Sequence, residues 1–526
     1  MPGRMFSSRR SLGILCLVLF LTFLDNTIVS VALSNIQSSL AAGVQDLQWI
    51  VDGYMLAFAV FMLSGGTLGD ILGRKKIMLG GVSLFIIGSA IAMLSNNVDL
   101  LVGGRVVMGL GAAASEPGTL SMIRHIFPEK HSRSRALGVW AAVSGTALAF
   151  GPIIGGVIIG FSNWRGVFAF SVIFGLVALI AGLLFLPENS DRLGRSFDIK
   201  GLIAGGVSIS SVTFGLIVGE NTGYRNPGII LLFVVSVLSM IAFIYNEIKA
   251  KDPVLPLKYF KKYQFSLANA VAFTANFGIF AVFFLVALYL QLIASYSGYR
   301  IALAFIAMTV AIVFSAIFAG RWNASHRTLP LTIFGCVLSA AGIILLETSI
   351  NPNIGTFRLS WVLAIAGLGF GICLVTMTST VLSVVPAERS GMAASTVNTF
   401  RELGGVFGVA VLGSIVNAQL NSHLVHRLQQ LHLPTNFQSF VIYAITHGGH
   451  TPSNVHISIA EIARHASLVQ TVEQSAFNAF GHGLTIALSL AASLLLATAA
   501  AAALVFSYKR SKDVIKDPTH YREQGL

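Results

Sequence analysis

The sequence predicts an all-α integral membrane protein with fourteen transmembrane helices, grouped as six, two and six. Apolar segments of helix-spanning length recur along the 526-residue chain, and only 10% of its residues are charged. About 20 apolar residues cross a bilayer as a helix, and a soluble protein carries roughly 25% charged residues. Helices of this length also satisfy their own backbone groups in lipid, which open sheets cannot do. The mean hydropathy of +0.79 agrees with this class.

The predicted spans follow from the apolar periodicity. The first six lie at about 12–34, 47–69, 77–96, 99–123, 136–160 and 166–186. An inserted pair lies at about 199–219 and 228–248, and the last six at about 265–293, 300–320, 330–348, 360–384, 392–417 and 482–507. The domains expected are an N-terminal six-helix bundle (1–190), two inserted helices with linkers (191–262), a C-terminal six-helix bundle (263–508) and a cytoplasmic tail (509–526).

The basic residues predict the orientation. With the N-terminus inside, 26 of the 34 Lys and Arg fall in inner loops and tails and six fall outside, as the positive-inside rule requires. The sequence therefore predicts a multi-pass protein of the cell membrane with both termini cytoplasmic, and the basic excess needs no nucleic-acid partner. Arg9, Arg10 and the apolar run after them resemble a signal peptide, but no small-residue cleavage site follows, so an uncleaved first span is expected.

One outer loop, 418–475, is long and holds seven histidines. Their spacing fits no metal-site pattern, so a solvated, partly helical loop is expected. The three cysteines lie isolated in apolar segments, which indicates neither a disulfide nor a metal centre. No metal or other cofactor is predicted, and the chain has no phosphate-binding G-x-x-x-x-G-K-[ST] motif for ATP.

Three ionisable residues inside spans are the first candidates for proton coupling. Asp25 lies roughly 20 Å from the inner face at 1.5 Å per residue, and charged groups at such depth are functional candidates by default. Arg105, roughly 9 Å from the outer face, lies at a similar depth and is expected to pair with Asp25; the alternative is that it binds backbone carbonyls of a kinked neighbour. Glu116 precedes Pro117, which removes a backbone hydrogen bond and kinks the helix, so the Glu116 carboxylate could face a cavity. The alternative is that Glu116 is held by the region of the carbonyl freed by Pro117 or by Arg124. Asp52 ranks third among the carboxyl candidates, because it lies only a turn from the outer end of its span and could simply reach water.

The substrate cavity is predicted on the ninth span, where aromatic and amide side chains share one helical face. Rings and a few polar groups suit a lipophilic or cationic ligand, although such a stripe is more often core or lipid-facing. The residues are Asn269, Phe273, Asn276 and Phe280.

Several motifs resemble those of the major facilitator superfamily. The turn Gly66-Thr67-Leu68-Gly69-Asp70-Ile71-Leu72-Gly73-Arg74-Lys75-Lys76 resembles motif A, and Gly151-Pro152-Ile153-Ile154-Gly155-Gly156 resembles the antiporter motif C. The segments 24–33, 101–113, 386–391 and 398–405 resemble further motifs of the fourteen-helix drug:proton antiporters of the EmrB/QacA type. Ile71 and Ala147 depart from the usual patterns.

The resemblance implies the major facilitator fold, two six-helix bundles plus two extra helices. It implies a gating role for Gly66, Asp70, Gly73, Arg74 and Lys75 at the inner face. It also implies that motif C (Gly151, Pro152, Gly155, Gly156) sets the contact between the halves, through a flat small-residue face.

The function expected is proton-driven antiport that exports small lipophilic or cationic compounds by alternating access, and not an enzyme activity. The alternative is a transporter of the same fold for one endogenous metabolite, lipid or siderophore, by export or uptake. The partners expected are a small-molecule substrate, protons and the lipid bilayer, with a periplasmic adaptor as an optional partner of an otherwise monomeric chain.

Overall fold

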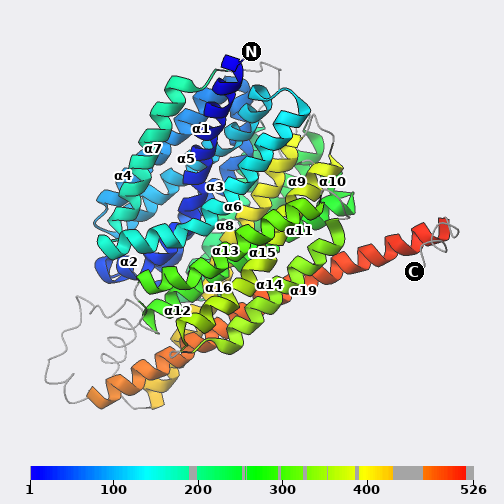
Figure 1. Cartoon of the computed structure of the whole chain (residues 1–526). Coiled ribbons are helices and arrows are strands. Elements are labelled where there is room, and N and C mark those ends of the chain that lie inside the picture. Colours follow the sequence, from blue (N-terminus) through cyan, green and yellow to red (C-terminus); the bar gives the residue numbers. More distant parts are fainter. Residues whose placement is uncertain are drawn as a thin grey trace.

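The computed structural model describes residues 2–188, 198–250, 255, 257–293, 296, 298–323, 328–351, 354–385, 390–430 and 466–516. Within these residues the secondary structure is helical throughout. Figure 1 shows the helices as one elongated bundle, with α19 projecting beyond it at the C-terminal end.

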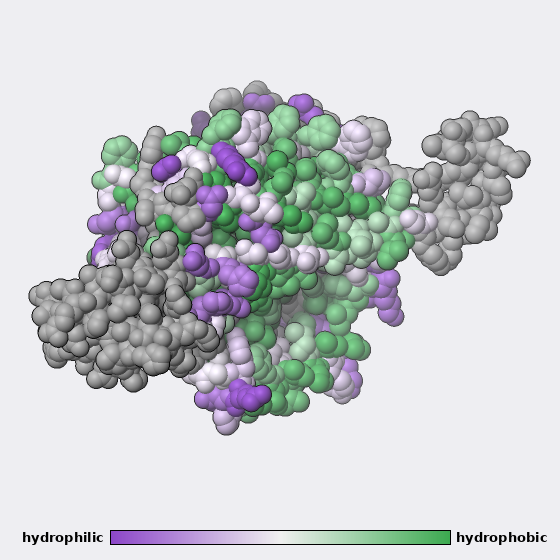
Figure 2. All heavy atoms as spheres, turned by 90° about the horizontal axis from the view of Figure 1, so that it is seen from below, coloured by the Kyte–Doolittle hydropathy of each residue, from purple (hydrophilic) through white to green (hydrophobic). Residues whose placement is uncertain are grey.

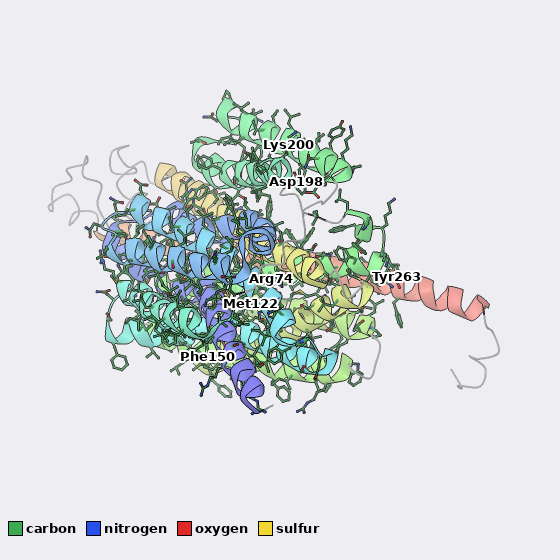
Figure 3. All side chains as sticks on the ribbon, turned by 90° about the horizontal axis from the view of Figure 1, so that it is seen from above. Arg74, Met122, Phe150, Asp198, Lys200 and Tyr263 are labelled. Atoms are coloured by element: carbon green, nitrogen blue, oxygen red, sulfur yellow. The ribbon has the colours of Figure 1, made fainter. Side chains whose placement is uncertain are left out.

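The N-terminal half consists of α1 to α7. Their bounds are α1 Pro2–Ile28, η1 Val29–Val31, α2 Leu33–Leu40, α3 Val44–Leu72, α4 Arg74–Leu94, α5 Val98–Ile126, α6 Lys130–Phe161 and α7 Arg165–Phe185. The inserted hairpin follows as α8 Ile199–Thr222 and α9 Pro227–Lys249. Seen along the bundle, the hairpin that carries Asp198 and Lys200 lies at the margin, whereas Arg74 and Met122 lie near the middle (Figure 3).

The C-terminal half consists of the remaining helices. They are α10 Leu257–Phe260, α11 Tyr263–Ala281, η2 Val282–Val286, α12 Ala287–Leu292, α13 Gly298–Asn323, α14 Thr328–Ser349, α15 Thr356–Val384, α16 Ser390–Gln430 and α19 Ala466–Lys516. The η2 segment is a π-helical turn inside the ninth predicted span, a distortion that is frequent at functional sites.

The predicted spans match these helices closely. Among the described residues, thirteen helical segments are long and apolar enough to cross a membrane, and each coincides with a predicted span. The remaining prediction, 47–69, falls on α3, which is a 29-residue helix. The protein is thus a multi-pass membrane protein.

Small residues let the helices pack closely within each half. A side chain at Gly111 of α5 would place its Cβ 2.4 Å from the backbone nitrogen of Phe85 in α4, so only glycine fits there. The two halves meet where α6 packs on α13 and α3 packs on α16, and α8 lies against both α3 and α16. Apolar side chains are exposed along the flanks, most of all on α7 and α9. The face seen in Figure 2 carries large apolar areas beside polar patches. A lipid-facing surface has this character.

Two helices extend beyond their predicted ends. The structure continues α16 to Gln430 and begins α19 at Ala466, so the predicted loop 418–475 is helical at both edges. Hydropathy marks only the part of a helix that lies in lipid, and it misses polar turns that continue into water. Residues 431–465, with five of the seven histidines, lie outside the described residues.

Candidate functional site

Asp25 and Arg105 form a buried ion pair. One guanidinium nitrogen of Arg105 in α5 donates a hydrogen bond to Oδ2 of Asp25 in α1, and both side chains are at most 1% exposed. The Nε of Arg105 donates to the carbonyl of Ile50 in α3 at 2.9 Å, and its guanidinium lies 4.4 Å from the ring centroid of Tyr54. The two arrangements that the sequence left open for Arg105, an ion pair with Asp25 and a hydrogen bond to a backbone carbonyl, therefore occur together.

Glu116 forms a polar contact between the halves. Its Oε1 accepts a hydrogen bond of 3.0 Å from Nδ2 of Asn398 in α16, and its Oε2 has no hydrogen-bond partner among the described residues. The side chain is fully buried. The partner expected within the N-terminal half, Arg124, has a side chain outside the described residues.

A second group of buried charges, on α16, was not predicted as part of the site. A guanidinium nitrogen of Arg401 lies 3.5 Å from Oε1 of Glu402, and the guanidinium lies 4.3 Å from the ring centroid of Phe23. Asn26 donates to Oε2 of Glu402 at 3.5 Å. The signal was present, because both charges lie about ten residues inside the predicted span 392–417 and such charges are functional candidates.

The structure corrects the expectation for Asp52. Its side chain is completely buried rather than in contact with water, and neither carboxyl oxygen has a partner among the described residues. The reason is that α3 packs against both α5 and α16, and the adjacent Gly53 lies against Val102 and Val106 of α5, so a position near the end of the helix does not give access to water.

Motif A forms a sharper junction than the loop expected. Gly73 has a φ of +112°, separates α3 from α4, and thereby leaves Gly66 and Asp70 within α3; the Asp70 side chain lies outside the described residues. Lys75 donates to the carbonyls of Leu183 and Leu186, at 2.9 and 2.7 Å. A cation at the end of α7 stabilises the helix dipole there. Arg74 begins α4.

The glycines Gly151 and Gly155 of motif C pack against α1 of the N-terminal half, and the helix that carries them, α6, also packs on α13 of the C-terminal half. The role of motif C in setting the contact between the halves stays a prediction. A Cβ on Gly151 would lie 2.0 Å from Oγ1 of Thr27, and one on Gly155 would lie 2.7 Å from the carbonyl oxygen of Ile28. Both contacts are with α1. The small-residue spacing shows that a close approach occurs, but it does not show which neighbour approaches. Pro152 lies inside α6, and Gly156 is buried in the same helix.

The residues predicted for the substrate cavity lie in the packed contact between α11 and α16. The amides of Asn269 and Asn276 donate to carbonyls of their own helix, and the ring of Phe273 lies 6.0 Å from that of Phe407. Phe280 lies beside Gly405 of α16. Their role in binding a substrate stays a prediction.

The remaining candidate groups offer no metal site in the described part of the chain. No three His, Cys, Asp or Glu side chains gather there as ligands. The sulfur atoms of Cys336 and Cys373, expected to be isolated, lie 3.7 Å apart as free thiols, because α14 and α15 pack side by side.

Taken together, consecutive residues of α1 contact both halves. Asp25 binds Arg105 in the N-terminal half and Asn26 binds Glu402 in the C-terminal half. Glu116 and Asn398 add a second link between the halves. A change in charge at Asp25 can therefore be transmitted to the contact between the halves through one turn of one helix.

Comparisons with known proteins identify the family of the chain. Residues 15–409 match the model of the Major Facilitator Superfamily. The Methylenomycin A resistance protein of Bacillus subtilis (strain 168) is 30% identical over 408 residues, covering 77% of this chain and 86% of the relative. The Multidrug resistance protein Stp of Mycobacterium tuberculosis (strain ATCC 25618 / H37Rv) is 30% identical over 427 residues, covering 81% and 79%.

Among solved structures, a bacterial homologue of the human lysosomal transporter Spinster, in an inward-facing and occupied conformation, shares the fold. Its TM-score is 0.60 at 16% identity, over 94% of this chain and 95% of that one. The family match covers well over half of the chain, from the N-terminal half into the C-terminal half, so the chain belongs to the Major Facilitator Superfamily.

Proposed function

We propose that this protein is a proton-driven antiporter that exports small lipophilic or cationic compounds from the cell by alternating access. The observation that carries the proposal is the buried pair of Asp25 and Arg105 on helices α1 and α5. The relatives are named as resistance proteins and efflux pumps, including the Multidrug efflux pump LfrA of Mycolicibacterium smegmatis at 29% identity over 417 residues, and these names support export of drugs.

The balance of buried charges supports proton transport. Asp25, Asp52, Glu116 and Glu402 are buried carboxyl groups, whereas Arg105 and Arg401 are the cations paired with members of this set. An ionised carboxylate without a cation is costly in a low-dielectric interior, and protonation removes that cost. A set with more carboxyl groups than cations can therefore hold protons at neutral pH.

The cycle would begin with a proton from outside. Protonation of Asp25 neutralises the carboxylate and weakens its attraction to Arg105, which leaves the guanidinium held by the Ile50 carbonyl and the Tyr54 ring. The adjacent Asn26 then shifts relative to Glu402, which favours the state that takes substrate from the inside. Binding of substrate expels the proton to the inside, and the restored ion pair favours the outward-open state.

The proposal includes fourteen spans, cytoplasmic termini and a gating role for motif A. The inserted hairpin α8–α9 supports the fourteen-helix type, because both of its helices are long and apolar enough to cross a membrane and they lie between the six-helix halves in the sequence. The basic residues support the orientation through the positive-inside rule.

The coupling can be tested in acid-inside proteoliposomes that contain the purified chain. Addition of ethidium or tetraphenylphosphonium is expected to raise the internal pH faster than in protein-free liposomes, because each imported cation exchanges for protons. Transport of these cations without any pH change would contradict proton antiport. A change of internal pH with one metabolite alone, and with neither cation, would favour the alternative of a transporter for a single endogenous compound.

Glu116 provides a separate prediction. Glu116→Gln keeps an oxygen that can accept from Asn398 but removes a titratable group, so we expect a normally folded protein that exchanges one proton fewer per ethidium. Parallel measurement of ethidium flux and internal pH gives this ratio. A ratio equal to that of the unaltered protein would limit Glu116 to a structural contact.

A further inference from the structure

A cavity of about 650 Å³ lies apart from the buried charges, at one end of the C-terminal half. It is lined by residues at the starts of α11 and α14, by the last turns of α15 and by Phe506 of α19. In the orientation proposed above, this end lies at the cytoplasmic membrane surface. Figure 3 shows Tyr263, at its mouth, on the side of the bundle near α19 and away from Arg74.

The mouth of the cavity is polar and basic. Lys262 and Ser383 are exposed there, and Thr328 and Thr380 are half-buried. One N–H of Lys262 donates to the Val384 carbonyl at 3.1 Å, which leaves two donors of the ammonium group for a ligand. No acidic side chain is among the described residues that line the cavity. The starts of α11 and α14 add the positive ends of two helix dipoles.

The deeper wall is apolar. Leu267, Ala268 and Met377 are buried there. Exposed apolar side chains flank the lining residues on three of the helices: Phe334 of α14, Leu382 of α15 and Leu504 of α19. A ligand in this cavity would therefore have an anionic group at the basic mouth and apolar chains beside a lipid-facing surface.

We propose that this cavity binds the phosphate head group of an anionic phospholipid from the inner leaflet. Its volume lies within the usual 300–1,000 Å³ range of small-molecule sites, and basic pockets between transmembrane helices on the cytoplasmic side recognise such head groups. Lys262 binds the phosphate, and the hydroxyl groups at the rim bind the remaining polar atoms. The site would link the lipid composition of the membrane to α11 and α15 of the C-terminal half.

Native mass spectrometry of the full chain tests this site without any transport assay. Palmitoyl-oleoyl phosphatidylglycerol is titrated against phosphatidylcholine as the neutral probe. We expect preferential binding of phosphatidylglycerol, and Lys262→Gln is expected to lower its affinity roughly fivefold, the effect of one basic residue near a membrane surface. Lys258→Gln removes a nearby exposed lysine that does not line the cavity and is expected to leave binding unchanged.

A second variant protects the test against misfolding. Thr380→Tyr fills the mouth from a half-buried position and keeps Lys262, so it is expected to lower phosphatidylglycerol binding as well. Equal loss from both lysine variants, or no loss from Lys262→Gln, would overturn the proposal in favour of general surface attraction. Displacement of the lipid by glycerol 3-phosphate would overturn it in favour of a soluble anion.

Discussion

Replacing Arg105 with Met is expected to lower the free energy of unfolding by roughly 3–5 kcal/mol, because it leaves the Asp25 carboxylate buried without its cation. The pair is almost completely buried, and Oδ1 of Asp25 already has no partner among the described residues. Asp25→Asn should also destabilise, since it leaves the guanidinium unpaired. The double variant Asp25→Asn/Arg105→Met removes both charges and should recover most of the lost stability.

In this set of two single variants and one double variant, transport is expected to change differently from stability. Each single variant and the double variant should fail to couple ethidium movement to protons, because the titratable carboxyl or its counter-charge is missing. Unfolding by SDS titration and flux in proteoliposomes give the two readouts. Arg165→Met is the matched control: this arginine binds the Ser95 carbonyl and lies over Trp164, and its loss should leave coupling intact. A double variant that recovers both stability and proton coupling would show that the pair is structural only.

Gly151→Ala is expected to reduce transport by roughly 100-fold, the effect of a shift of about 1 Å at a functional group. The added Cβ would lie 2.0 Å from Oγ1 of Thr27 and 2.9 Å from the backbone nitrogen of Ile28, so α1 must move away from α6. Thr27 lies two residues from Asp25, and the move displaces the carboxylate from Arg105. Overpacking of this kind costs about 1–3 kcal/mol of stability.

The control for this prediction lies on the same helix. Gly160 has open space around the position of an added Cβ, so Gly160→Ala should change neither transport nor stability. Thr27→Ala removes the atom that clashes, and combining it with Gly151→Ala should restore part of the activity. Equal activity of Gly151→Ala and Gly160→Ala in ethidium efflux would rule out a positional role for motif C.

The sequence predicted the helical spans well, because hydropathy is local and each span carries its own signal. It also predicted the contact of Asp25 with Arg105, since depth in the membrane restricts which intramembrane charges can meet. Depth alone could not place Asp52, whose burial depends on the neighbours α5 and α16. The contact of Glu116 with Asn398 joins residues 282 positions apart in the chain, which no local pattern indicates.

Motif C shows the same limit of a local sequence pattern. A row of glycines on one helix face indicates that another helix packs closely there, but it does not indicate which helix. Here the helix that packs against these glycines is α1. Arg401 and Glu402 were missed although two charges in the middle of a span are a clear sequence signal.

The role of Asp25 in coupling can be measured as the release of protons when substrate binds. Purified protein in weakly buffered detergent solution is mixed with ethidium, binding is followed by dye fluorescence, and pH is recorded at the same time. We expect proton release from the unaltered protein and none from Asp25→Asn, although that variant still binds the dye. Equal proton release from Asp25→Asn would contradict the assignment of coupling to Asp25.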